Sequence, residues 1–540
     1  MALFPRSTRL GRLLLTLAAA VGGGASLRSQ QPAVRPFALE EVGVAELQRR
    51  MAAGTTTSRA LVDQYLARIE AIDRSGPTLR SVIELNPDAR AIAHRLDTQR
   101  RAGRVRGPLH GIPVVIKDNI ATGDAMRTSA GSLALAEARA PRDAFIVARL
   151  RDAGAVLLGK TNLSEWANFR STHSTSGWSA RGGQTRNPYA LDRNPSGSSS
   201  GTGAAIAASL AAVGVGTETD GSIVSPANVN GIVGMKPTLG LVSRTGIVPI
   251  AHSQDTAGPM GRSVSDVAAL LTVLASPDPA DSITTTPVRQ QADYTQALDP
   301  NGLRGARIGI VRNRLFGAHA ATDALANAAI EVMRRQGATI VDPVNIPTLG
   351  QFEDSEFEVL LYEFKADFPK FFEWWGPGAP LKNLADLIAY NKAHAATELQ
   401  HFGQELVEQA NAKGPLTDAA YVQALAKNRR LAATEGIDAV MNANRLDALV
   451  APTGGPAWLI DLVNGDSGTA MAPGPSTVTS VAGYPHITVP MGFDHGLPVG
   501  ISFFGRAWSE ATLIRLAYAY EQATHHRTPP TFARAANVAR

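Results

Sequence analysis

The sequence contains no cysteine in 540 residues. This absence excludes disulfide bonds, thiolate nucleophiles and cysteine-ligated metals. Charged residues make up only 18% and aromatic residues 6%, while 44% of the residues are hydrophobic, which is too apolar a composition for a disordered protein. Fixed-period repeats and low-complexity linkers are also missing from residues 35–530. The chain therefore has the composition of a large globular protein that can bury a sizeable core.

The formal net charge is +5, but three arginines lie within the first dozen residues, directly before the apolar run Leu13–Val21. This run is too short to span a bilayer, and its pattern is typical of a secretory signal peptide. We expect residues 1–30 to be a signal peptide, and residues 31–540 to form a mature protein in the periplasm or outside the cell. We expect no membrane attachment after its removal. The remaining charge is small, so no nucleic-acid partner is predicted.

Short apolar runs separated by helical patterns predict an α/β fold. Buried strands are predicted at 111–116, 155–158, 211–215, 307–311 and 448–450, and helices at 143–153 and 263–274 and from Ser58 onward, with Ser58 as the cap. This alternation predicts a single-domain α/β/α sandwich around a central mixed β-sheet.

A helical insert is predicted at about residues 355–430. It carries an aromatic cluster, composed of Phe368, Phe371, Phe372, Trp374 and Trp375. Such a cluster either packs in the core or forms one wall of a substrate cleft.

Two segments match known catalytic or nucleotide-binding sequence patterns, but their surroundings do not fit the function. Two other catalytic patterns do not occur. Gly154–Thr161 fits the phosphate-loop pattern G-x-x-x-x-G-K-[ST], but its four middle residues are apolar and predict a buried strand instead of a loop. Gly197–Gly201 fits the G-x-S-x-G nucleophile elbow, but a polar loop precedes it where the elbow requires a hydrophobic strand. The patterns H-E-x-x-H and S-x-x-K do not occur. We therefore expect neither a cofactor nor a metal.

Two segments rich in serine, threonine and glycine, 195–203 and 214–222, flank an alanine-rich stretch and lead into a region with little charge. Isolated segments of this kind are usually flexible loops. Here their apolar surroundings favour a pocket lined by backbone groups and hydroxyls.

Three motifs in this region resemble those of the amidase signature hydrolases: Gly111–Asp118 resembles G-x-P-x-x-x-K-D, Ser196–Gly201 the glycine-serine loop, and Gly216–Ile223 the motif G-T-D-x-G-G-S-I. Further segments with the same likeness extend over nearly the whole mature chain. Within the family, the sequence resembles bacterial peptide amidases most, which remove ammonia from C-terminally amidated peptides.

The resemblance implies a catalytic relay in place of a Ser-His-Asp triad. Ser222 would be the nucleophile, Ser198 would relay its proton, and Lys117 would be the base. A lysine can act as a base only if burial lowers its pKa, and the apolar residues before Lys117 are consistent with such burial. The family also implies a cis peptide bond before Ser198.

The resemblance also assigns supporting groups. The backbone N–H groups of Thr219, Asp220, Gly221 and Ser222 would form the oxyanion hole. Ser199 would support the relay by hydrogen bonding. Asp118 would be either a supporting residue or a purely structural carboxylate.

The sequence departs from the family pattern at Ser196, Ser200 and Val224. Many relatives carry arginine at the position of Val224. Without that arginine the site lacks a bidentate partner for a substrate carboxylate, which favours a neutral substrate. We expect release of ammonia from C-terminal carboxamides of peptides, through an acyl-enzyme. The alternatives are hydrolysis of small aliphatic or aryl amides, a non-catalytic binding protein on the same scaffold, and an amidotransferase subunit acting on charged tRNA.

Overall fold

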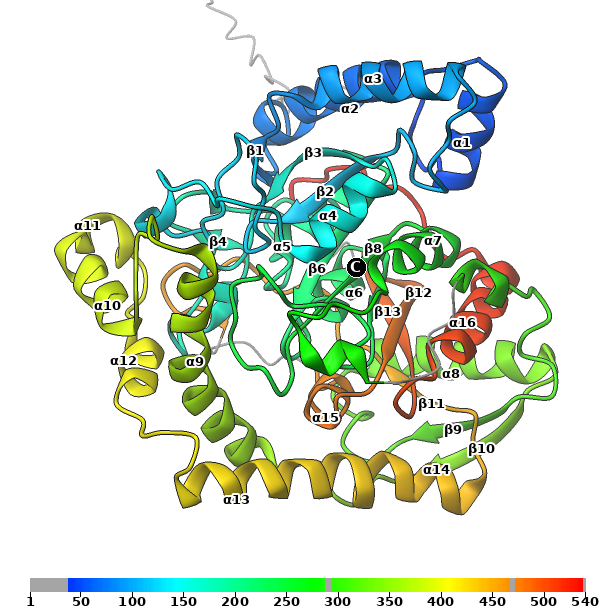
Figure 1. Ribbon diagram of the computed structural model, residues 1–540. Helices are drawn as coiled ribbons and strands as arrows, with labels where there is room; N and C mark the ends of the chain where they lie inside the picture. Colours follow the sequence, from blue (N-terminus) through cyan, green and yellow to red (C-terminus); the bar gives the residue numbers. More distant parts are fainter. Residues whose placement is uncertain (1–36, 287–292, 467–471, 538–540) are drawn as a thin grey trace, which may run out of the picture. The chain divides into compact units, whose positions relative to one another are not determined.

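The apolar runs of the sequence form one large mixed sheet (Figure 1). The computed structural model describes residues 37–286, 293–466 and 472–537, all of which belong to one compact unit, and the predicted signal peptide lies outside them. In spatial order the eleven strands of the sheet are β1 (Val82–Leu85), β3 (Val156–Thr161), β2 (Pro113–Lys117), β6 (Val213–Glu218), β8 (Thr256–Gly261), β7 (Val233–Lys236), β12 (His486–Asp494), β13 (Leu497–Phe504), β11 (Ala448–Pro452), β9 (Arg307–Val311) and β10 (Thr339–Val344). A separate short hairpin pairs β4 (Trp178–Ser179) with β5 (Gly183–Gln184).

The sheet contains two parallel sections joined by antiparallel strands. β3, β2 and β6 run parallel, as do β11, β9 and β10. The strands between them, from β6 through β8, β7, β12 and β13 to β11, pair antiparallel. The predicted central mixed sheet is therefore confirmed.

The α-helices of the described residues are α1 (Val44–Ala52), α2 (Ser58–Arg68), α3 (Ala89–Arg101), α4 (Phe145–Asp152), α5 (Ser200–Ala207), α6 (Val224–Val229), α7 (Val264–Leu274), α8 (Ala320–Arg335), α9 (Glu353–Trp375), α10 (Leu384–Ala393), α11 (Ala395–Glu398), α12 (Glu405–Asn411), α13 (Ala419–Asn428), α14 (Ala439–Asn444), α15 (Ser476–Ala482) and α16 (Glu510–Thr524). None of them combines the length and the apolar character that a membrane-crossing helix needs.

Helices cover both faces of the sheet, as neighbouring residues of β8 show. A Cβ atom at Gly216 of β6 would touch Met260 of β8 and Ser199 at the start of α5, whereas a Cβ at the next β8 residue, Gly261, would touch Val267 of α7. Because successive strand residues point to opposite faces, α5 and α7 lie on opposite sides of the sheet. The architecture is an α/β/α arrangement.

The predicted helical insert corresponds to α9 through α13, which lie together beside the sheet and are coloured yellow-green to gold in Figure 1. Its aromatic residues are mostly core: Phe368, Phe371, Phe372 and Trp375 are buried and contact one another. The core interpretation is therefore confirmed, and Phe371 also lines a cavity described below.

Two local predictions can be compared with the structure in detail. The phosphate-loop match forms β3, in which every residue is buried, and Lys160 donates its hydrogen bonds to Ile120 O and Thr128 Oγ1. The prediction that this segment is a buried strand and no phosphate loop is therefore confirmed. The predicted cap Ser58 is wrong by one residue: Thr57 caps α2 by accepting from Ala60 N, while the Ser58 hydroxyl donates to Gly111 O.

Candidate active site

Lys117 ends β2 in the interior of the protein, with no exposed surface. Its Nζ lies 2.7 Å from Ser198 Oγ, 2.8 Å from Thr217 Oγ1 and 3.1 Å from Thr217 O. Burial lowers the pKa of Lys117 to about 7, although the negative charges of Glu218 and Asp255 oppose the shift. Near neutral pH this amine is thus available in its unprotonated form.

Thr217 and Asn119 were not among the predicted site residues. Thr217 Oγ1 accepts hydrogen bonds from Lys117 Nζ and, at 3.0 Å, from Asn119 Nδ2. Asn119 directly follows the motif that supplies the lysine, and Thr217 lies within the second serine motif, so their positions in these motifs were the available signal. Their contact depends on the parallel pairing of β2 with β6, which no local pattern specifies.

Ser198 follows a cis Gly197–Ser198 peptide bond, as the family resemblance implied. It is fully buried. A Cβ atom at Gly197 would lie 2.2 Å from Ser164 Oγ, so only glycine fits there. Ser199 supports the arrangement indirectly: its hydroxyl donates to Thr217 O at 3.1 Å and accepts from Thr217 N at 3.2 Å.

Ser222 lies in the turn between β6 and α6, next to the serine loop. Ser199 N donates to Ser222 O at 3.1 Å, which joins the two serine segments. Glu218 fixes the turn because its Oε2 accepts from Ile223 N at 2.7 Å and Val224 N at 3.1 Å. Gly221 has φ of +73°, a conformation that favours glycine.

Four consecutive backbone N–H groups of this turn have no partner among the described residues. Those of Thr219, Asp220, Gly221 and Ser222 donate no hydrogen bond to any other residue that the structure describes. They are suited to receive a developing negative charge.

Asp118 follows Lys117 in sequence, but its contacts lead elsewhere. Its carboxylate accepts hydrogen bonds from Ser129 Oγ, from Ser129 N at 3.3 Å and from Arg181 at 3.3 Å. Burial raises the pKa of Asp118, while Arg181 and Lys160 oppose the shift. Of the two interpretations of Asp118, these contacts support the structural one.

Two cavities adjoin the turn that carries Ser222. The larger, of about 850 Å³, is lined by Gly197, Asp220, Gly221 and Val224, together with residues of α15 and the chain around Trp458. The smaller, of about 260 Å³, is lined by Thr217, Glu218 and Thr219 and by the loop 244–252. The backbone between Thr219 and Asp220 therefore passes from one cavity to the other.

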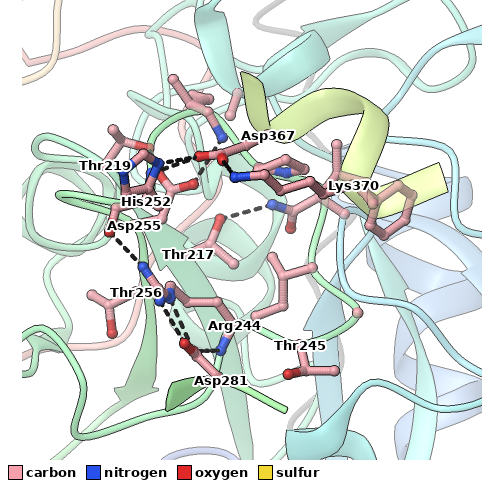
Figure 2. A pocket seen from close by; sticks show the side chains of 18 of the residues that line it. Thr217, Thr219, Arg244, Thr245, His252, Asp255, Thr256, Asp281, Asp367 and Lys370 are labelled. Atoms are coloured by element: carbon pink, nitrogen blue, oxygen red, sulfur yellow. Dashed lines mark hydrogen bonds and ion pairs between the residues drawn. The ribbon is translucent and has the colours of Figure 1, made fainter. Parts of the chain in front are cut away.

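Figure 2 shows the smaller cavity, with His252, Asp367 and Lys370 on one side. His252, Glu363 and Asp367 offer three potential metal ligands whose atoms lie within 4.8 Å of one another. However, Asp367 already accepts from His252 and Lys370, and Glu363 accepts from Ser253 N and Tyr421 OH.

The direction of the pKa shift of His252 fits this pattern of pairing. Burial acts to lower the pKa of His252, but the hydrogen bond from its ring to Asp367 and the charges of Asp367 and Glu363 outweigh burial and raise it. Lys370 also donates to Asp367, so every member of the group has a protein partner. We therefore describe the group as an ion-pair cluster.

Comparison with known proteins identifies the chain. A sequence model of the amidase family matches residues 60–514. A protein of Arabidopsis thaliana described as a probable amidase is 40% identical over 523 residues, which cover 95% of each chain. The chain belongs to the amidase family. It is a serine amidase, an enzyme that hydrolyses carbon–nitrogen bonds.

Solved structures of this amidase family are similar over most of the chain. The native peptide amidase of Stenotrophomonas maltophilia is 56% identical and has a TM-score of 0.88, covering 92% of this chain and 100% of its own. The peptide amidase PAM in complex with the competitive inhibitor chymostatin is also 56% identical, with a TM-score of 0.89 and the same coverage. The predicted family and fold are thereby confirmed.

Proposed function

We propose that this amidase releases ammonia from the C-terminal carboxamides of peptides, using Lys117, Ser198 and Ser222 as a catalytic relay. The observation that carries the mechanism is the 2.7 Å hydrogen bond between Lys117 Nζ and Ser198 Oγ in a fully buried site. A serine hydroxyl needs a base to attack an amide, and a lysine with a pKa of about 7 can serve as one.

The reaction has two halves. Ser222 Oγ attacks the amide carbonyl, and its proton passes to Ser198 Oγ as the Ser198 proton passes to Lys117. The carbonyl oxygen gains negative charge, and the unpaired N–H groups of residues 219–222 stabilise it. The proton then returns through Ser198 to the leaving nitrogen, the C–N bond breaks, and ammonia leaves an acyl-enzyme. Water attacks this ester along the same proton path and releases the carboxylic acid.

Two further observations support a peptide amide as the substrate. The larger cavity of about 850 Å³ has room for several residues of a peptide, since ligand pockets of drug-sized molecules measure about 300–1,000 Å³. Val224 lines this cavity and presents no charge to a substrate carboxylate. The similarity at 56% identity to solved peptide amidases points to the same substrate class.

The substrate proposal is tested by measuring ammonia release from an N-acetylated dipeptide amide, from acetamide and from benzamide. We expect the dipeptide amide to have the highest kcat/KM. Mass spectrometry of an unamidated longer peptide should show no internal cleavage. Faster turnover of the small amides would favour the small-amide alternative, and cleavage of internal bonds would contradict the proposal.

We also propose that the protein is exported and that residues 1–30 are removed. This rests on the arginines and the apolar run at the N-terminus.

A further inference from the structure

Three carboxylates of α9 hold the loop that precedes β8. Glu356, Glu363 and Asp367 lie seven and four residues apart, a spacing that places them on one face of a helix. Each binds a successive residue of the loop. Glu356 Oε1 accepts from Gln254 Nε2 at 2.8 Å, Glu363 Oε2 from Ser253 N at 2.9 Å and Asp367 Oδ2 from His252 N at 3.0 Å.

Two residues of the same loop form hydrogen bonds with Thr219. Gln254 Nε2 donates to Thr219 O at 3.2 Å, and the Thr219 hydroxyl donates to Asp255 Oδ1 at 2.6 Å. Figure 2 shows Thr219 beside Asp255 at the wall of the smaller cavity. Gln254 is 1% exposed. Its Nε2 faces two oxygen acceptors, Thr219 O and Glu356 Oε1, so the donor end of the amide is the one placed there.

The bond to Thr219 O has a consequence on the other side of the peptide plane. The Thr219–Asp220 peptide bond is trans, because the cis bonds of the described residues are elsewhere. In a trans peptide the C=O of one residue and the N–H of the next point in opposite directions within one plane. A donor that fixes Thr219 O therefore also fixes the direction of the Asp220 N–H.

The direction of the Asp220 N–H can be related to the two cavities. Thr219 lines the smaller cavity and Asp220 lines the larger one. Gln254 approaches the peptide plane from the side of Thr219 O, so the Asp220 N–H is directed away from Gln254. That N–H is one of the four donors of the turn that have no partner in the described part of the chain.

We propose that Gln254 is a positioning residue of the oxyanion hole, and that Glu356 of α9 acts through it. This inference rests on the proposed function, in which the Asp220 N–H stabilises the oxyanion. The helical insert then has a catalytic role besides packing: its carboxylate row fixes the loop 252–255, and the loop aligns a peptide dipole with the transition state.

The test uses Gln254→Met, which preserves side-chain size and removes both donors. Loss of one oxyanion-hole donor lowers kcat by about 100- to 1,000-fold, and misalignment should cost less, so we expect a fall in kcat of about 10-fold with little change in KM. Glu356→Leu should lower kcat similarly, while Glu356→Gln, which retains an oxygen acceptor, should recover most of it. The double variant Gln254→Met/Glu356→Leu should be little worse than either single variant, since both break one chain of contacts.

A second measurement separates alignment from general loss of structure. A peptide aldehyde adds to a serine hydroxyl to give a tetrahedral hemiacetal, which engages the oxyanion hole, whereas the corresponding peptide N-methylamide binds as a ground-state analogue. In Gln254→Met the inhibition constant of the aldehyde should rise in proportion to the loss of kcat, with that of the N-methylamide unchanged. The matched control is Glu358→Leu, which removes an α9 carboxylate that binds Lys413 and not the loop; it should retain wild-type kcat.

Two outcomes would overturn the inference. One is a wild-type kcat in Gln254→Met; the other is an equal weakening of aldehyde and N-methylamide binding. Either result leaves the proposed function intact as long as Ser222→Ala remains inactive. If Ser222→Ala retained activity, the proposed function itself would fail.

Discussion

In the proposed relay, the pH dependence of the reaction follows from the burial of Lys117. With a pKa of about 7, the amine is neutral in about nine-tenths of the molecules at pH 8 and about one-tenth at pH 6. Only the neutral form accepts a proton from Ser198. We therefore predict that kcat/KM for a peptide amide falls about tenfold between pH 8 and pH 6, and is level above pH 8.

A second group could in principle produce the same profile. Burial raises the pKa of Asp255 to about 6, against the effect of its hydrogen bonds. The variant Asp255→Asn distinguishes the two, because it leaves Lys117 in place. Since the charge of Asp255 raises the pKa of Lys117, its removal should shift the inflection to lower pH without abolishing it.

The assay is ammonia release at low substrate concentration from pH 5.5 to 9, with circular dichroism to confirm folding at each pH. Lys117→Arg is the second control, because a guanidinium stays protonated and should be inactive throughout this range. A wild-type profile that is flat from pH 5.5 to 8 would refute the assignment of the base. So would an inflection that disappears in Asp255→Asn.

Three further predictions concern the relay, metals and export. Ser198→Ala and Lys117→Ala should each lower kcat by orders of magnitude. Because the two residues act as a unit, the kcat of the double variant should be no lower than that of the less active single variant. Additive losses in steady-state kinetics would contradict this. EDTA should leave activity unchanged, because protein donors already occupy the carboxylates of the His252 cluster; loss of activity that zinc restores would reveal a metal-dependent step. N-terminal sequencing of the native protein should give a start between residues 26 and 31, and recovery of an intact Met1 from the cytosol would exclude export.

Five of the eleven strands of the sheet, β2, β3, β6, β9 and β11, could be predicted from the sequence because their signal is local. The run Arg307–Val311 matches β9 residue for residue, and the four apolar residues within Gly154–Thr161 correctly predict a strand. The cap of α2 was misplaced because Thr57 and Ser58 are both good caps, and the contact of Ser58 with Gly111 that decides between them spans 53 residues.

The candidate site was predictable only in part, because some of its contacts join residues that are far apart in the sequence. Lys117, Ser198 and Ser222 lie in motifs that resemble a family, and the structure brings Lys117 and Ser198 into contact. Gln254 lies in no such motif. It is 35 residues from Thr219 and 102 from Glu356, so its position between them depends on the packing of α9 against the loop before β8. Contacts of this kind arise from the tertiary fold and leave no pattern in the local sequence.

The identity of the nucleophile is tested most directly by covalent labelling. A peptidyl phosphonate that mimics a C-terminal amide should inactivate the enzyme at one equivalent, and peptide mapping should find the phosphonyl group on Ser222. Ammonia release should fall in proportion to the labelled fraction, and Ser222→Ala should be neither labelled nor active. Labelling of a different residue that accounts for the lost activity, or full activity in a protein labelled at Ser222, would contradict the assignment of Ser222 as the nucleophile.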